Sequence, residues 1–178
     1  FFPNRDVALY VSPIIQTWVG LRYYFAGRSG DAIPEYRKAL ELERDFAPAH
    51  WHLGWAYEQT GRFEEGVSEA RRALALDDGN LLYLSSLGHA YARAGMTSDA
   101  HAILARLEEA SGHRHVSAYH VAVIYLALGN TAAGLDCLER AYDEQSPWSG
   151  YLRVDSRVDP ARGTPRFDSL LRKARLRF

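Results

Sequence analysis

The chain has 178 residues, of which 47% are apolar and 24% charged, with a formal net charge of −1 and a single cysteine. This composition is ordinary for a soluble globular protein, and the near-zero charge gives no reason to expect binding to nucleic acid or to a membrane. One cysteine excludes an internal disulfide framework and a cysteine-based zinc site, and it fits a reducing, cytoplasmic compartment. No apolar run is long enough to span a bilayer.

Residues 1–12 are weakly patterned, and we expect a lead-in or the remnant of a preceding element there. The chain starts with Phe1 rather than methionine. We therefore interpret it as a piece of a longer protein that carries other domains.

From Pro13 onward, glycine, tyrosine and alanine recur at intervals of 34 residues. The repeated positions are Gly20, Gly54 and Gly88, followed by Ala122; Tyr23, Tyr57, Tyr91 and Tyr125; and Gly27, Gly61, Gly95 and Gly129. Each interval holds two amphipathic segments separated by a turn glycine, which is typical of a helical hairpin. The pattern predicts first helices near 14–26, 48–60, 82–94 and 116–128, and second helices near 31–43, 64–76, 98–110 and 132–144.

The motif L-G-x-x-Y at 53–57 and again at 87–91, with the turn glycine and the closing Ala-Leu, resembles the tetratricopeptide repeat family. The resemblance covers about residues 13–146, as four repeats at 13–46, 47–80, 81–114 and 115–146. It implies an all-α, right-handed superhelical solenoid of four helical hairpins closed by a C-terminal capping helix. It also implies a non-catalytic protein–protein interaction scaffold that binds a peptide or helix of a partner in its concave groove.

Residues 147–178 leave the repeat pattern, and we expect them to form a C-terminal cap, because the end of a solenoid exposes apolar surface. Trp148 and Tyr151 are expected to anchor this cap, and Phe167, Leu170 and Leu171 to form the apolar face of its helix. The eight Arg or Lys between residues 153 and 177 are interpreted as the solvated outer face of that helix, so nucleic-acid binding is not expected.

The tail also resembles the segment that closes repeat regions in bacterial multidomain regulators, after winged-helix, adenylate-cyclase or kinase domains. The matching pieces are Glu-Arg-Ala-Tyr at 139–142, Pro-Trp at 147–148, Val-Asp at 154–155, Asp-Pro at 159–160 and Pro-Arg-Phe at 165–167. This resemblance implies that the chain is the C-terminal part of a larger bacterial regulatory protein.

The family resemblance also implies which side chains face the concave groove and contact a partner. They are Thr17, Leu21, Tyr24, Trp51, Trp55, Glu58, Ser85, His89, Arg93, Tyr119 and Val123. Trp51 and Trp55 are four residues apart on a helix and therefore form one aromatic strip, a plausible hot spot. An equally weighted alternative is that the chain's own tail, or packing between first helices, fills this groove.

No catalytic, metal or cofactor site is predicted. The histidines do not converge in the number that zinc requires. Helix spacing allows Ser85 and His89 to meet, with Glu58 on the preceding repeat, but no nucleophile elbow or oxyanion turn accompanies them. Cys137 lies between acidic neighbours, which raise a thiol pKa and disfavour a reactive thiolate.

Two other kinds of function remain open. One is self-association as a structural module, for which an apolar edge around Ile14, Ile15 and Trp18 is suited. The other is an accessory region of an enzyme or transcription factor whose activity lies outside these residues. In each case the sequence leaves the partner unidentified.

Overall fold

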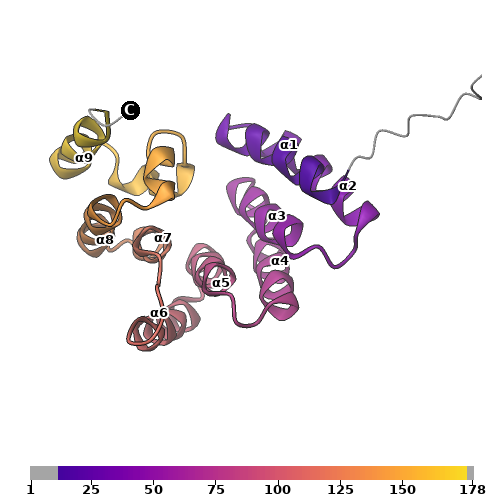
Figure 1. The fold of residues 1–178 in the computed structure, drawn as a ribbon, viewed down its shortest axis with the longest axis horizontal. Helices are drawn as coiled ribbons and strands as arrows, with labels where there is room; N and C mark the ends of the chain where they lie inside the picture. The colour runs from indigo at the N-terminus through magenta and orange to yellow at the C-terminus, as the bar shows by residue number, and fades with distance from the viewer. Residues whose placement is uncertain (1–11, 176–178) are drawn as a thin grey trace, which may run out of the picture.

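The structure is a computed structural model that describes residues 12–175. It is all-helical over this range (Figure 1). The helices are α1 (Pro13–Phe25), α2 (Ser29–Leu42), α3 (Ala47–Gln59), α4 (Phe63–Leu76), α5 (Leu81–Arg93), α6 (Thr97–Ser111), α7 (Ala118–Ala127), α8 (Thr131–Asp143) and α9 (Pro165–Arg175), with two 3₁₀ helices, η1 (Pro147–Tyr151) and η2 (Ser156–Ala161). Helices α1 to α8 form four antiparallel hairpins, which confirms the predicted solenoid. No helix in the described range combines the length and apolar character needed to cross a membrane.

The turn inside each hairpin is made by its glycine. Gly27, Gly61, Gly95 and Gly129 have φ between 74° and 80°, a left-handed conformation that other residues adopt at a cost. This conformation ends the first helix and reverses the chain within a few residues. Recurrence of glycine at this position is therefore a requirement of the backbone.

Small residues at the hairpin crossing let the two helices approach closely. A Cβ atom built on Gly66 of α4 would lie 2.8 Å from Cγ of Glu58 and 3.2 Å from the carbonyl oxygen of Gly54, both on α3. Backbone-to-backbone packing thus explains the stripe of small residues that begins at Gly66 on this second helix. Ala70 and Ala73 continue it and are fully buried.

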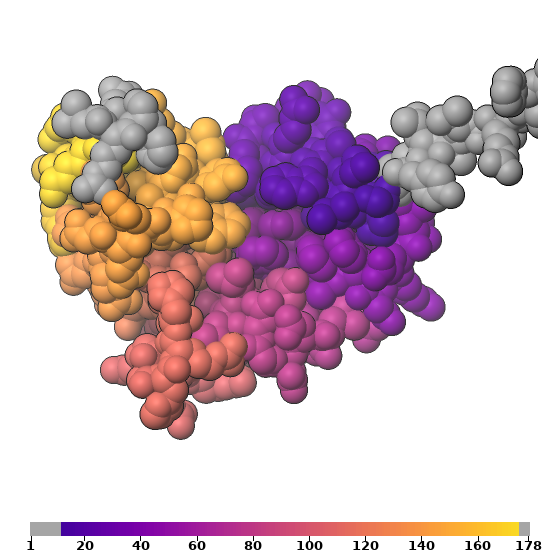
Figure 2. Space-filling view, viewed as in Figure 1, coloured from indigo at the N-terminus to yellow at the C-terminus, as the bar shows by residue number. Residues whose placement is uncertain are grey.

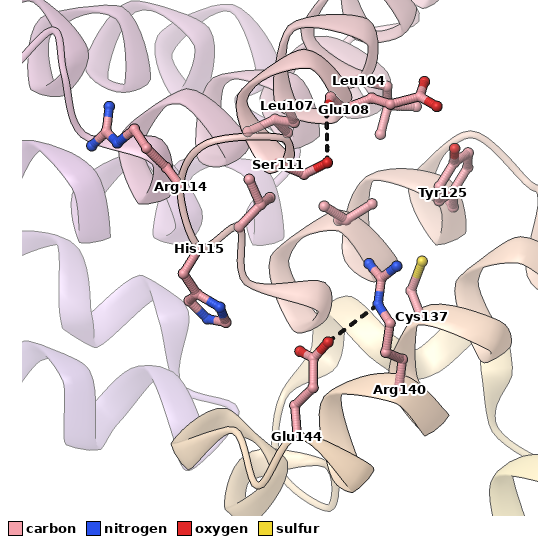
Figure 3. A pocket seen from close by; sticks show the side chains of 12 residues that line it. Leu104, Leu107, Glu108, Ser111, Arg114, His115, Tyr125, Cys137, Arg140 and Glu144 are labelled. Atoms are coloured by element: carbon pink, nitrogen blue, oxygen red, sulfur yellow. Dashed lines mark hydrogen bonds and ion pairs between the residues drawn. The ribbon is translucent and has the colours of Figure 1, made fainter.

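The regular stacking changes between the third and fourth hairpins. Helix α6 has 15 residues and α7 only 10, and a six-residue connection, 112–117, separates them, so α7 begins two residues later than predicted. Apart from α8, its partner in the hairpin, helix α7 packs mainly against α5 and makes few contacts with α6 (Figure 1). A cleft of about 380 Å³ remains between α6 and α8, with Leu104 on one side and Tyr125 and Arg140 on the other (Figure 3).

The C-terminal segment turns back into the concave side of the solenoid. Helix α9 packs on α8 through Phe167 and Leu170, which are 0% and 2% exposed, so the predicted capping helix is confirmed. The two 3₁₀ helices precede it and lie inside the curve formed by α1, α3, α5 and α7 (Figure 1). In the space-filling view this segment, in orange, meets the first repeat, in indigo (Figure 2).

Candidate interaction site

The structure brings most of the predicted partner-binding residues together, but it covers them. Nine are buried (Thr17, Tyr24, Trp51, Trp55, Glu58, Ser85, His89, Tyr119 and Val123), Leu21 is half-buried and Arg93 is exposed. Residues of η1 and η2 provide much of this cover. The open concave groove expected from the repeats is therefore filled by the chain's own tail, the alternative that the sequence left undecided.

Trp148 of η1 is the centre of the filled groove. Its ring centroid lies 6.0 Å from those of both Trp51 and Trp55, and 4.8 Å from that of His120. Its neighbour in η1, Tyr151, stacks on Phe25 at 4.5 Å. Both predicted anchors of the cap are confirmed, and the aromatic strip on α3 packs against them instead of facing solvent.

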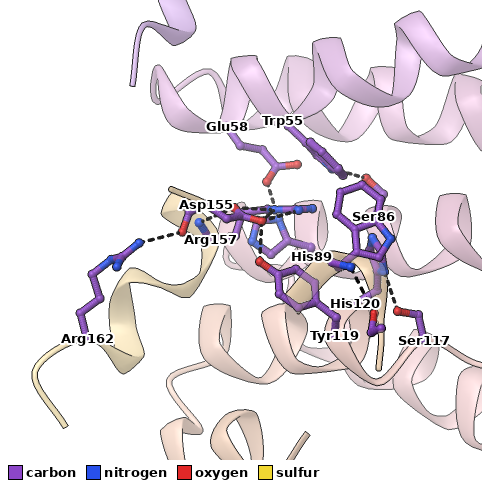
Figure 4. A network of polar contacts seen from close by, with 12 residues as sticks. Trp55, Glu58, Ser86, His89, Ser117, Tyr119, His120, Asp155, Arg157 and Arg162 are labelled. Carbon is purple, nitrogen blue, oxygen red and sulfur yellow. Dashed lines mark hydrogen bonds and ion pairs between the residues drawn. The ribbon is translucent and has the colours of Figure 1, made fainter. Parts of the chain in front are cut away.

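A buried ion pair fixes η2 beneath this aromatic cluster (Figure 4). Arg157 Nη2 donates to Asp155 Oδ2 at 2.6 Å, and the side chains are 1% and 0% exposed. The guanidinium carbon of Arg157 lies 3.6 Å from the ring centroid of Trp55, a cation–π contact. Tyr119 donates its hydroxyl to Asp155 at 2.9 Å. Burial raises the pKa of Asp155, but Arg157 outweighs it and holds this pKa below its usual value.

The possible Ser85–His89–Glu58 arrangement does not form a relay. His89 Nδ1 lies 2.6 Å from Glu58 Oε2, and both side chains are buried. Ser85, however, donates its hydroxyl to the carbonyl of Leu81 in its own helix at 2.6 Å. Its hydroxyl proton is therefore directed at that carbonyl and not at His89, and the His89–Glu58 contact joins α5 to α3.

Two further histidines border the ion pair and are neutral. Burial, and then the charge of Arg157, lower the pKa values of His52 and His120 to about 3. His120 Nδ1 lies 2.9 Å from the hydroxyl of Ser117. Within residues 12–175, no three His, Cys, Asp or Glu side chains lie close enough together to hold a metal ion.

Cys137 lies in the cleft between α6 and α8. The pKa of its thiol is raised chiefly by burial, whereas the sequence indicated its acidic neighbours as the cause. The charge of Asp136 also raises this pKa, and the charge of Arg140 lowers it. A thiol with a raised pKa is a weak nucleophile at neutral pH.

One part of the concave side stays open, as an apolar pocket of about 360 Å³ where α1, α3 and η1 meet. Its lining residues are Ile14, Thr17, Trp18, Leu21, Pro48, Trp51, His52, Pro147, Trp148 and Tyr151. Thr17, Leu21 and Trp51 belong to the predicted set. The repeat pattern did not identify the wall made by η1, because that wall lies outside the repeats.

The same pocket continues onto an exposed apolar face of α1. Ile14, Ile15 and Trp18 are 53%, 51% and 59% exposed. In the later repeats, the positions equivalent to Trp18 are occupied by His52, Ser86 and His120. All three side chains are buried. Helix α1 thus presents a face of the kind that the other first helices bury, and within residues 12–175 no hairpin precedes it.

Comparison with known proteins supports the repeat assignment. Residues 20–80 match the model of the tetratricopeptide repeat family. A comparison with curated proteins gives no match.

Solved structures show the same fold. The chain is similar to PilF of Pseudomonas aeruginosa, with a TM-score of 0.58 and 19% identity over 90% of this chain and 75% of that one. It is also similar to a tetratricopeptide repeat protein of Parabacteroides merdae, with a TM-score of 0.55 and 13% identity over 97% of this chain and 68% of that one. Solenoids of this family generally act as non-enzymatic scaffolds for protein–protein interaction.

Proposed function

We propose that the chain is a non-catalytic protein-interaction scaffold that binds a peptide or helix of a partner where α1, α3 and η1 meet. The observation that carries this proposal is the apolar pocket beside Trp18, a large side chain that is 59% exposed. Contiguous exposed apolar surface of this kind marks interaction sites in soluble proteins. The deeper groove is occupied by η1 and η2. The partner therefore binds at the rim, by which we mean this pocket together with the exposed side chains of Ile14 and Trp18.

The rim is suited to an amphipathic segment. Its walls are aromatic and aliphatic, and Trp18 can close over an inserted side chain in the way that interface anchors do. A helix that carries apolar residues three and four apart would place one anchor in the pocket and another along Ile14.

Trp18→Ala tests this proposal. The probe is a synthetic amphipathic helical peptide with leucines at the i, i+3, i+4 and i+7 positions, followed by the change in intrinsic tryptophan fluorescence. Because Trp18 is exposed, the variant should keep its helical circular dichroism and bind the peptide at least about tenfold more weakly. Leu42→Ala, a change at an exposed apolar residue at the end of α2 that does not line the pocket, is the matched control. Equal affinity of Trp18→Ala and the unchanged chain would contradict the proposal.

Self-association is a second candidate, favoured by the outward part of the same α1 face. Ile15 is 51% exposed and does not line the pocket. In sedimentation over the micromolar range we expect a mass that rises with concentration, and Ile15→Lys should abolish the rise while leaving peptide binding in the pocket intact. A strictly monomeric unchanged chain would remove this candidate.

We further propose that the chain is the C-terminal docking region of a larger bacterial regulatory protein. The Pro-Trp and Val-Asp motifs of the tail support this proposal, since they supply Trp148 and Asp155, the residues that fill the groove. The reading frame upstream of Phe1 tests it directly: a frame that encodes no regulatory domain would contradict it.

A further inference from the structure

We propose that the C-terminal segment, residues 147–175, exchanges between two copies of the chain, so that the segment of each copy fills the concave groove of the other. This inference goes beyond the proposed function, because the partner is a second copy and the surface is the filled groove instead of the rim. In the exchanged dimer, the wall that η1 gives to the pocket beside Trp18 comes from the other copy.

The groove is complementary to the C-terminal segment of this same chain. The ring of Trp148 lies 6.0 Å from those of Trp51 and Trp55, and Tyr119 donates its hydroxyl to Asp155 at 2.9 Å. These contacts join side chains far apart in the sequence, and none of them involves the residues that link α8 to η1. The identical segment of a second copy would therefore make the same contacts.

The link between α8 and η1 is short and strained. It consists of residues 144–146, and Gln145 at its centre has a φ of 56°. Every other residue of the range 12–175 with a positive φ is a glycine, because a side chain in this conformation meets the backbone. A short strained hinge favours exchange, since the link is extended in the exchanged dimer and the strain is released in both copies.

The hinge is exposed and only lightly held. The amide of Gln145 donates to the carbonyl of Tyr142 at 3.0 Å, and that of Ser146 to the carbonyl of Ala141 at 2.9 Å. Both bonds belong to the turn that ends α8, and Gln145 is exposed. Opening the hinge therefore breaks this turn without disturbing the aromatic cluster in the groove.

The length of the link determines how the two copies meet. From Asp143, the last residue of α8, to Pro147, the first of η1, an extended chain spans at most about 14 Å. The two α8 helices must therefore end close together, on either side of a twofold axis. The segment crosses as one unit, so Phe167 and Leu170 of α9 pack on α8 of the other copy.

Exchange is slow, because the segment must first leave the groove together with the buried pair of Asp155 and Arg157. We expect the exchanged dimer after unfolding and refolding at high protein concentration, and it should persist after dilution as a separate peak in gel filtration. Self-association through the α1 face needs no such step and re-equilibrates on dilution. Ile15→Lys should therefore leave the exchanged dimer unchanged.

The test uses two full-length variants, both with the single cysteine removed by Cys137→Ser. One carries Phe25→Cys and the other Tyr151→Cys, at the two rings that stack at 4.5 Å. The mixture is unfolded in urea, refolded at high concentration and oxidised. Disulfide-linked pairs of chains should be at least about tenfold more abundant than in a matched mixture in which Leu42→Cys, at an exposed residue of α2, replaces Tyr151→Cys.

A second pair of variants tests the link and leaves the groove intact. Gln145→Gly adopts the left-handed conformation without strain, and should raise the dissociation constant of the exchanged dimer at least about tenfold. Glu144→Gly, at the neighbouring residue with a φ of −73°, is the matched control and should have a smaller effect.

Linked pairs no more abundant than in the control mixture would overturn the inference. So would a Gln145→Gly variant that dimerises as readily as the unchanged chain or as Glu144→Gly. The proposed function is judged separately, because binding of the helical probe that depends on Trp18 would still support it.

Discussion

Gly66 shows at the scale of one residue how the repeat is specified. Gly66→Ala places a Cβ atom 2.8 Å from Glu58 Cγ, close to the backbone of α3. The two helices must then separate, and we expect a loss of about 1–3 kcal/mol in the free energy of unfolding. Gly30→Ala is the matched control, because Gly30 also lies in a second helix but has nothing within 4 Å of the added atom. Urea denaturation should show Gly30→Ala to be neutral or slightly stabilising; an equal loss in both variants would contradict the packing explanation.

His52 and His120 make stability depend on pH. Their pKa values are about 3 in the fold, against 6.5 for an ordinary histidine. Below pH 6.5 the unfolded chain takes up these protons and the folded chain does not. The contribution of the two histidines to the free energy of unfolding is therefore fully present above pH 6.5 and is lost as the pH falls toward 3. At pH 5 the two histidines together should cost about 4 kcal/mol relative to pH 7.

The measurement is urea denaturation of the full chain at a series of pH values between 7 and 5, above the range in which Asp155 titrates. His120→Gln should reduce the slope of the free energy of unfolding against pH by the equivalent of about one proton, whatever the stability of the variant at pH 7. A slope insensitive to His120 would show that this side chain is not buried in the neutral form.

At the scale of elements, the buried ion pair fixes η2 in the groove. Arg157→Leu leaves Asp155 charged and buried, and should cost about 3–5 kcal/mol in calorimetry or urea denaturation. The double variant Asp155→Asn with Arg157→Leu removes both charges and should recover part of that loss. Arg166→Leu, which breaks only the exposed pairs with Asp136 and Glu139, should change the midpoint little. Similar losses in Arg157→Leu and Arg166→Leu would contradict this assignment.

The hairpins could be predicted because each depends on contacts within one repeat or with the next. Turn glycines and small residues recur where the backbone requires them, and the family resemblance then supplied the concave positions. The placement of η1 and η2 could not be predicted, because Trp148 meets Trp51 and Trp55 across almost a hundred residues. For the same reason the burial of the predicted site and the pocket beside Trp18 became visible only in the structure.

At the scale of the whole molecule, the C-terminal segment is expected to be required for a dry groove. A chain that ends after residue 146 would expose Trp51, Trp55 and Tyr119, together with the surface of α8 that α9 covers. We expect this truncated chain to bind the dye ANS, to shift its tryptophan emission to longer wavelength and to melt at a lower temperature. Trp148→Ala in the full chain, which keeps α9, should show a smaller change of the same sign. A truncated chain with unchanged emission and melting temperature would show that the segment does not seal the groove.

The stack of Phe25 on Tyr151 joins the first hairpin directly to the last part of the chain. In an ordinary solenoid each repeat contacts only its neighbours. Such a molecule behaves as an open spring, and it can unfold from either end, one repeat at a time. Here the two ends of the spring are held together, so the molecule has the mechanics of a closed loop. Drawn out by its termini, it should resist until this contact and the aromatic cluster around Trp148 give way, and only then lengthen repeat by repeat.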